Sequence, residues 1–346
     1  MTDLPAAESR RAVGIWLLVC CAMVAVMVVL GGATRLTESG LSIVEWRPVT
    51  GILPPLGEAD WQALYDAYRR SPEFQRVNFW MTVGDFRTIF WLEYIHRLWG
   101  RLIGVVFLLP FLWFLVRGRL IGAFAWRLAG AFVLGGLQGL LGWYMVKSGL
   151  ADRTDVSQYR LAAHLVLAFL IYGWLLWLAL RCLSPPAMRA RPAFLRGHAI
   201  AVAAGALLTV VAGAFVAGID AGLAYNTFPL MDGRLVPPGA MQLDPWWLNF
   251  FENTATVQFT HRTMAILLVA AVLWLWFRGR NVDLPAATRA LLDALAAAAL
   301  VQMALGIATL LTAVALPLGV LHQAGALALF TLALWAVHAL GAQPSR

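Results

Sequence analysis

The chain is built from long apolar runs separated by shorter polar segments. An α-helix rises about 1.5 Å per residue, so about 20 apolar residues cross the hydrocarbon core of a bilayer. Eight runs meet that length, and each is expected to form a helix because lipid offers the backbone no hydrogen-bond partners. The predicted spans cover 13–33, 92–116, 126–147, 160–181, 199–218, 257–277, 289–312 and 318–340.

Two connections between these runs are long, 34–91 and 219–256, and the others are short. Both long connections contain tryptophans, such as Trp61 and Trp246, which is typical of segments that lie at a membrane surface. In the first connection, residues 57–70 place apolar side chains at helical spacing after an acidic start. This pattern predicts one short amphipathic helix.

Basic residues indicate how the spans are oriented. Arginines are concentrated at the N-terminus and in the connections after the second, fourth and sixth spans, as at Arg117, Arg119, Arg278 and Arg280. Short loops rich in arginine and lysine stay in the cytoplasm. We therefore expect an inner-membrane protein with both termini in the cytoplasm and both long connections on the periplasmic side.

Composition agrees with this interpretation. Of the 346 residues 61% are hydrophobic and the mean hydropathy is +0.74, which indicates an all-α polytopic membrane protein. The net charge of +8 comes from arginines spread over the loops, so it reports membrane topology and predicts no nucleic-acid partner. Cys20, Cys21 and Cys182 lie in or beside apolar runs without metal-ligand spacing, and we expect them to be buried without a functional role.

The chain contains an internal repeat. Residues 1–190 and 191–346 each hold four spans, so both halves start on the same side of the membrane. We expect two four-helix bundles related by a pseudo-twofold axis along the membrane normal. The matching motifs are His96 with His261, His164 with His322, Gln138–Gly142 with Gln302–Gly306, and Gly32…Gly40-Leu41 with Gly213…Gly222-Leu223.

Four histidines lie at repeat-related positions, each a few residues inside the outer end of a span. A single histidine in an apolar helix is usually a hydrogen-bonded packing residue, but four at one depth point to ligands. Zinc would need three or four ligands in one cluster, whereas two facing imidazoles supply both axial positions of a haem iron. We predict one haem pocket in each half, formed by His96 with His164 and by His261 with His322.

Charged residues accompany the histidines. Arg97, Arg101 and Arg262 have two open interpretations: they extend toward the lipid headgroups, or they pair with haem propionates. Glu93 corresponds to Gln258 in the second half, which cannot ionise. Glu93 is either a weak salt-bridge partner of Arg97 or an acid/base or electrostatic group. The difference between the halves favours chemistry in the first pocket and a fixed cofactor in the second.

Several segments together match one known family: Gly32–Ser42, Trp46–Pro48, Glu93–Arg101, His164 within Leu161–Leu165, Phe259–Arg262 and Leu321–Gln323. With these segments the chain resembles the haem A synthase family over nearly its whole length. Members of that family oxidise the C8 methyl group of haem O to a formyl group and so make haem A for terminal oxidases. Both long connections lack the cysteine pair of some bacterial members, which places the chain nearer the proteobacterial and mitochondrial branch.

The resemblance implies a role for each of these side chains. His96 and His164 would hold the substrate haem O, His261 and His322 would hold a haem b cofactor, and Glu93 matches the family's functional glutamate. It also implies the lipid bilayer as surroundings and haem O synthase, terminal oxidase assembly proteins and a second copy of the chain as candidate partners.

Two other functions fit part of the pattern. A di-haem b electron-transfer protein, without chemistry on the haem, would use the same kind of ligand, but such proteins commonly carry two histidines on one helix. A haem or solute transporter would share the repeat but needs a site near the bilayer midplane. Neither function explains why Gln258 stands where the first half has Glu93.

Overall fold

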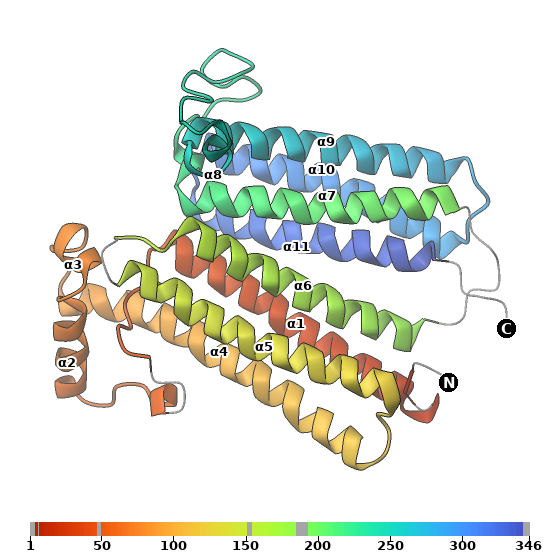
Figure 1. The fold of residues 1–346 in the computed structure, drawn as a ribbon, viewed down its shortest axis with the longest axis horizontal. Helices are drawn as coiled ribbons and strands as arrows, with labels where there is room; N and C mark the ends of the chain where they lie inside the picture. Colours follow the sequence, from red (N-terminus) through yellow and green to blue (C-terminus); the bar gives the residue numbers. More distant parts are fainter. Residues whose placement is uncertain (1–3, 6, 47–49, 151–153, 185–192, 342–346) are drawn as a thin grey trace.

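Eight helices long and apolar enough to cross a membrane lie side by side in the computed structural model of the protein, which describes residues 4–5, 7–46, 50–150, 154–184 and 193–341 (Figure 1). This arrangement confirms the predicted all-α fold class and each predicted span. The helices are α1 (Arg10–Leu36), α4 (Val83–Val116), α5 (Gly122–Gly149), α6 (Gln158–Leu183), α7 (Ala193–Gly218), α9 (Thr254–Arg280), α10 (Ala286–Leu311) and α11 (Leu316–Ala339).

The remaining helical elements are short, and most lie in the two long connections. α2 confirms the predicted amphipathic helix, and it buries Trp61, Tyr65 and Tyr68 on one face. The short elements are α2 (Glu58–Tyr68), α3 (Pro72–Arg76), α8 (Asn249–Glu252) and 3-10 turns at Ala7–Ser9, Thr50–Ile52, Ala221–Leu223 and Trp246–Leu248.

The helix contacts divide the spanning helices into two bundles of four. The two bundles lie against each other (Figure 1). In the first bundle α1 and α5 each pack against both α4 and α6, and in the second α7 and α10 each pack against both α9 and α11. The same pairings in both halves are compatible with the predicted pseudo-twofold relation. The predicted boundary at residues 190 and 191 lies outside the described residues.

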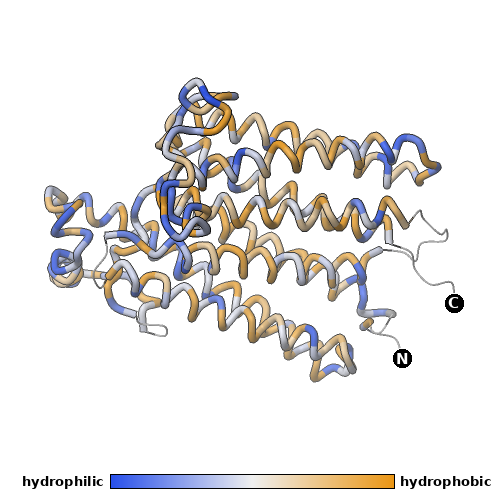
Figure 2. The backbone as a smooth tube through the Cα atoms, turned by 45° about the horizontal axis from the view of Figure 1, so that its top comes forward, coloured by the Kyte–Doolittle hydropathy of each residue, from blue (hydrophilic) through white to orange (hydrophobic). Residues whose placement is uncertain are grey.

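The two ends of the bundle differ. Both long connections lie at one end, which we call the loop end, while α1 starts and α11 finishes at the other (Figure 1). Hydrophobic residues occupy the middle of the helices, and hydrophilic residues gather toward the two ends (Figure 2). An apolar band between polar ends is what a bilayer requires, so the chain is a multi-pass membrane protein.

The two bundles share one hydrophobic core. At the interface, α6 packs against α7 and α11, and α1 packs against α11. The contact between α6 and α11 joins one histidine-bearing helix of each half. Hydrogen bonds across the interface join Tyr172 to Thr331 (2.7 Å), Gln323 to the carbonyl of Val28 (2.8 Å) and Arg35 to the carbonyl of Ala217 (2.9 Å).

Helix α4 starts at Val83, nine residues before the predicted start of its span at 92. Thr82 and Asp85 form a capping box there, which satisfies free N–H groups of the first turn. The added turns place Phe86 and Phe90 against Trp61 of α2, with ring centres 6.5 and 5.0 Å apart. The extension was missed because it is amphipathic and packs on the loop, not on lipid.

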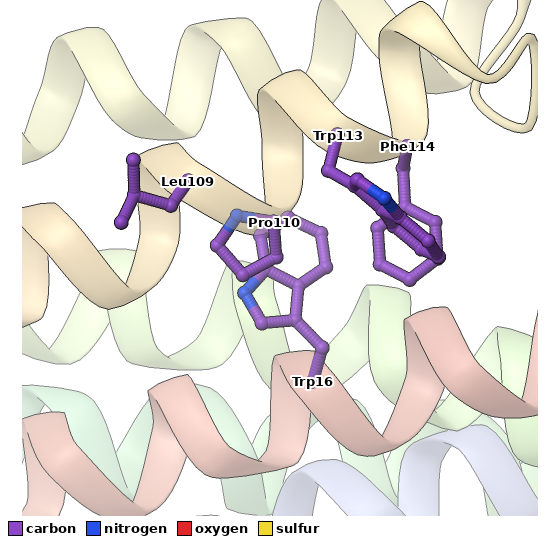
Figure 3. Close-up of a pocket in the computed structure, with 5 residues that line it drawn as sticks. All are labelled: Trp16, Leu109, Pro110, Trp113 and Phe114. Atoms are coloured by element: carbon purple, nitrogen blue, oxygen red, sulfur yellow. The ribbon is translucent and has the colours of Figure 1, made fainter.

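Pro110 lies inside α4, near the end opposite the long connections. Proline has no N–H, so the carbonyl of Val106 loses its helical partner, and the indole of Trp16 donates to it at 3.0 Å. Trp16 and Pro110 also line a shallow apolar pocket with Leu109, Trp113 and Phe114 (Figure 3). Pro110 lies 14 residues beyond His96, roughly 20 Å along the helix, so this pocket is remote from the histidines.

Candidate functional site

Each of the four predicted ligand histidines lies against a glycine of a neighbouring helix. Without a Cβ, these glycines let the imidazole ring reach the helix backbone. His96 is on α4, His164 on α6, His261 on α9 and His322 on α11. A Cβ added to the glycine would approach the ring Cε1 to 3.2 Å for Gly31 and His96, 2.9 Å for Gly142 and His164, 3.0 Å for Gly213 and His261, and 2.8 Å for Gly306 and His322.

These glycines place the four histidines at similar depth. Three of them lie five residues before the loop end of their helix, and Gly142 lies seven residues before Gly149. This corresponds to roughly 7–11 Å below the helix ends. His96 lies further from the start of its helix because α4 extends beyond the other spanning helices at the loop end. The sequence pattern paired Gly32 with Gly213, but the contact with His96 is made by Gly31.

The two rings of the second-half pair are separated by the distance that two ligands of one metal would need. A metal held between two imidazole nitrogens by bonds of about 2.0 Å leaves roughly 6 Å between the ring centres. The ring centres of His261 and His322 are 6.4 Å apart, with the planes at 89°. Nδ1 of His261 lies 3.2 Å from the carbonyl oxygen of Thr209. A proton on Nδ1 satisfies that oxygen and leaves Nε2 free to bind iron.

Glutamines hold one histidine of each pair. Gln302 Nε2 donates to the backbone carbonyl of His322 at 2.9 Å and lies 3.1 Å from its Nδ1. Gln138 Nε2 donates to the backbone carbonyl of His164 at the same distance, 2.9 Å. The repeated segments Gln138–Gly142 and Gln302–Gly306 therefore make the same two contacts. The glutamine donates to the histidine backbone, and the glycine one turn later packs against the ring of the same histidine.

The first-half pair is arranged in the same way. A backbone carbonyl lies beside each ring, that of Leu30 for His96 and that of Gln138 for His164. The carbonyl of Thr209 lies likewise beside His261. The two pairs are therefore held by the same kind of backbone contact.

Both sites offer two protein ligands only. Among the described residues, no three His, Cys, Asp or Glu side chains come together as ligands for a bare metal ion. A pair of imidazoles suits an iron whose other four positions are filled by a macrocycle. The residues present thus fit haem, and they do not fit a structural zinc site.

Glu93 is 3% exposed, and both of its carboxylate oxygens are held. One oxygen accepts hydrogen bonds from Ser42 Oγ (2.6 Å) and the backbone N–H of Ile43 (2.8 Å). The other accepts from Nε (3.0 Å) and Nη2 (2.5 Å) of Arg97. The predicted salt bridge exists, and it is buried, although a salt bridge at this spacing was predicted to be weak. Breaking a buried pair typically costs about 3–5 kcal/mol.

Arg97 and Arg262 anchor the long connections in the same way. Arg97 donates to the carbonyls of Ile43 (2.9 Å) and Glu45 (3.3 Å). Arg262 donates to the carbonyls of Tyr225 (2.5 Å) and Thr227 (2.8 Å), again two residues apart. This role was not predicted, because the partners are backbone atoms. Arg101 lies one turn further into α4 and is partly buried.

A second buried carboxyl group, Glu73, lies outside the membrane-spanning helices. It is 4% exposed and accepts a hydrogen bond from Tyr68 at 3.0 Å, and Asn78 donates to the same tyrosine oxygen at 2.9 Å. Burial raises the pKa of Glu73 to about 8. Glu73 belongs to the aromatic cluster around α2 and is close enough to Glu93 for the two carboxylates to interact electrostatically.

Comparisons with known proteins agree on one family. A family model described as cytochrome oxidase assembly protein matches residues 14–334. A haem A synthase of Rhodospirillum centenum is 53% identical over 96% of this chain and 90% of its own. Similar relatives are the haem A synthases of Nitrosospira multiformis, 50% identical over 96% and 95%, and of Nitrosomonas eutropha, 49% identical over 95% and 93%.

Proposed function

Because the chain belongs to the cytochrome oxidase assembly protein family and is about half identical to several haem A synthases, we propose that its two histidine pairs bind haem for different purposes. The chain is a membrane enzyme that makes haem A from haem O. In this proposal residues 1–190 form the reacting half, and residues 191–346 form the half that carries a haem b cofactor.

The second pocket suits a resident cofactor. His261 and His322 are at the spacing that two ligands of one iron would have, the carbonyl of Thr209 lies beside the His261 ring, and Gln302 donates to the backbone carbonyl of His322. Gln258, at the position of Glu93, adds no charge. When bound there, haem b would supply electron transfer. The protein contributes the two ligands and their orientation.

The first pocket is the one we assign to the substrate. The observation that separates the two pockets is the Glu93 carboxylate, three residues before His96, where the second half has the amide of Gln258. His96 and His164 would hold the iron of haem O and so place its edge in one position.

Glu93 is the group we assign to the reaction. Conversion of a methyl to a formyl group replaces two C–H bonds by one C=O bond, so protons and electrons leave and an oxygen atom is supplied by water or O2. A buried carboxylate stabilises the positive charge that develops as they leave. Four hydrogen bonds hold the Glu93 carboxylate in one orientation on the helix that carries His96. The second pocket has no such charge and is assigned no chemistry.

Arg97, Arg101 and Arg262 are the proposed partners of the haem propionates. Charge-assisted bonds from guanidinium groups to carboxylates are short and directional. Arg97 and Arg262 already contact carbonyls of the long connections, so a propionate there would be bound together with the loop. This arrangement would close each long connection over its haem.

Orientation and partners follow from the same proposal. We place both termini in the cytoplasm, the loop end and its pockets on the periplasmic side, and the protein in the inner membrane. Haem O synthase and proteins that assemble terminal oxidases are the proposed partners, since haem O must arrive and haem A must depart. A homo-oligomer is a further proposal.

Extraction of the pigments from the purified protein tests the proposal. A haem A synthase should contain haem b together with haem O or haem A. A di-haem electron-transfer protein would contain haem b alone, in equal amounts in both pockets, and that result would overturn the proposal.

A further inference from the structure

Ser42 and Glu93 form a pair that occurs in one half only. The repeat aligns Gly40-Leu41 with Gly222-Leu223, so Ser42 corresponds to Ala224, as Glu93 corresponds to Gln258. Both members of the pair therefore differ between the halves. In the second half, Ala224 has no hydroxyl and Gln258 has no charge.

The structure confirms this alignment of the two loops. Arg97 binds the carbonyls of the first and third residues after Ser42, which are Ile43 and Glu45. Arg262 binds the carbonyls of the first and third residues after Ala224, which are Tyr225 and Thr227. The same arginine geometry in both halves fixes the register between the loops.

We propose that Ser42 is a positioning residue that orients the Glu93 carboxylate for the reaction in the first pocket. This inference rests on the proposed function, in which that pocket is the reaction site. Ser42 is 2% exposed, and its hydroxyl lies 2.6 Å from the carboxylate oxygen but 3.4 Å from the nearest alternative acceptor, the carbonyl of Ile89. A bond of that length to a carboxylate is strong and directional.

Anchoring of the loop does not require this serine. In the second half Arg262 holds the corresponding loop, and Gln258 Nε2 donates to the carbonyl of Tyr225 at 3.2 Å, although Ala224 offers no hydroxyl. In the first half the loop is the donor and the side chain is the acceptor: the N–H of Ile43 and the hydroxyl of Ser42 donate to Glu93. Two donors on one oxygen orient a charge, and only the first half has a charge to orient.

The test compares Ser42→Ala, Ser42→Thr and Ala224→Ser in the full-length protein in membranes that supply haem O. Loss of one hydrogen bond to a charged group lowers the rate by about ten- to a hundredfold. We expect this loss in turnover for Ser42→Ala, with KM for haem O and the haem b content unchanged. Ser42→Thr keeps the hydroxyl and should restore the rate. Ala224→Ser, at an exposed position in the second half, should have no effect.

A combined variant separates positioning from loop structure. Once Glu93→Gln has removed the charge, Ser42→Ala should lower turnover no further. Normal turnover in Ser42→Ala, while Glu93→Gln is inactive, would overturn the positioning role and leave the proposed function intact. If Ser42→Ala lost haem O binding and Ser42→Thr did not restore it, Ser42 would have a structural role and the positioning role would be overturned. Normal haem A production by Glu93→Gln would overturn both.

Discussion

Gly306 on α10 lies so close to His322 on α11 that a Cβ at this glycine would come within 2.8 Å of the ring Cε1. The ring and the glycine backbone occupy the space that a methyl group would need. The orientation of this proposed iron ligand is therefore set by a residue with no side chain, on a different helix.

Gly306→Ala should displace His322 and lower the haem b content severalfold, and Gly142→Ala should displace His164 and lower haem O turnover while haem b stays bound. A matched control is Gly139→Ala, because a Cβ at Gly139 meets nothing within 4 Å. Optical spectra of the purified variants measure the bound haem b. Full haem b content in Gly306→Ala would show that the contact does not position the ligand.

Loss of the histidines should affect the two pockets differently. His261→Ala or His322→Ala is expected to lose the resident haem b, because a haem iron with one ligand left is held weakly. His96→Ala should keep haem b and stop turnover. Haem b content per protein and haem A yield together measure the effect. Equal loss of bound haem in both classes of variant would mean that the assignment of the two pockets is wrong.

Glu93→Gln is expected to keep the fold and both haems and to accumulate haem O or a part-oxidised product. An amide replaces the charge by a dipole, and loss of one preorganised electrostatic group costs about 10²–10³ in rate. Gln258 shows that an amide is accommodated beside the corresponding arginine. Asp66→Asn, which alters an exposed carboxylate of α2, is the control and should leave haem A production unchanged. Near-normal haem A in the Glu93 variant would defeat the catalytic assignment.

The stability of the aromatic cluster around α2 should fall as pH rises. The pKa of Glu73 is raised to about 8 from its ordinary 4.5, so the folded cluster holds this proton more tightly than the unfolded chain. The stabilisation is complete below pH of about 4.5 and is lost as pH rises through about 8. Hydrogen exchange in α2 and α3 measures it. Glu73→Gln cannot titrate and should flatten this dependence; an unchanged pH profile would assign the effect to another group.

The orientation can be tested with a reporter fused after Arg346. A reporter that is active in the cytoplasm is expected, because arginines flank the ends of the helices opposite the long connections. The same reporter placed within the second long connection should be active only in the periplasm. The reverse pattern would place both haem pockets on the cytoplasmic side.

Hydropathy alone determined the eight spans, because a backbone in lipid must bond internally and so forms a helix wherever the chain is apolar for long enough. Spacing along those helices was also sufficient to place the four histidines at similar depth and to bring Glu93 next to Arg97, four residues on. These features depend on helix geometry, which every apolar run shares.

Contacts between helices and with the loops were decided only by the tertiary structure. Hydropathy does not show which glycine meets a ring, so Gly31 could not be distinguished from Gly32 before α1 was packed against α4. Burial of the Glu93–Arg97 pair likewise depends on the loop at Ser42, 51 residues away in the chain. The use of a backbone carbonyl such as that of Thr209 cannot be predicted from the sequence. Every residue has a backbone carbonyl, and only the packing of the helices decides which carbonyl lies beside a histidine.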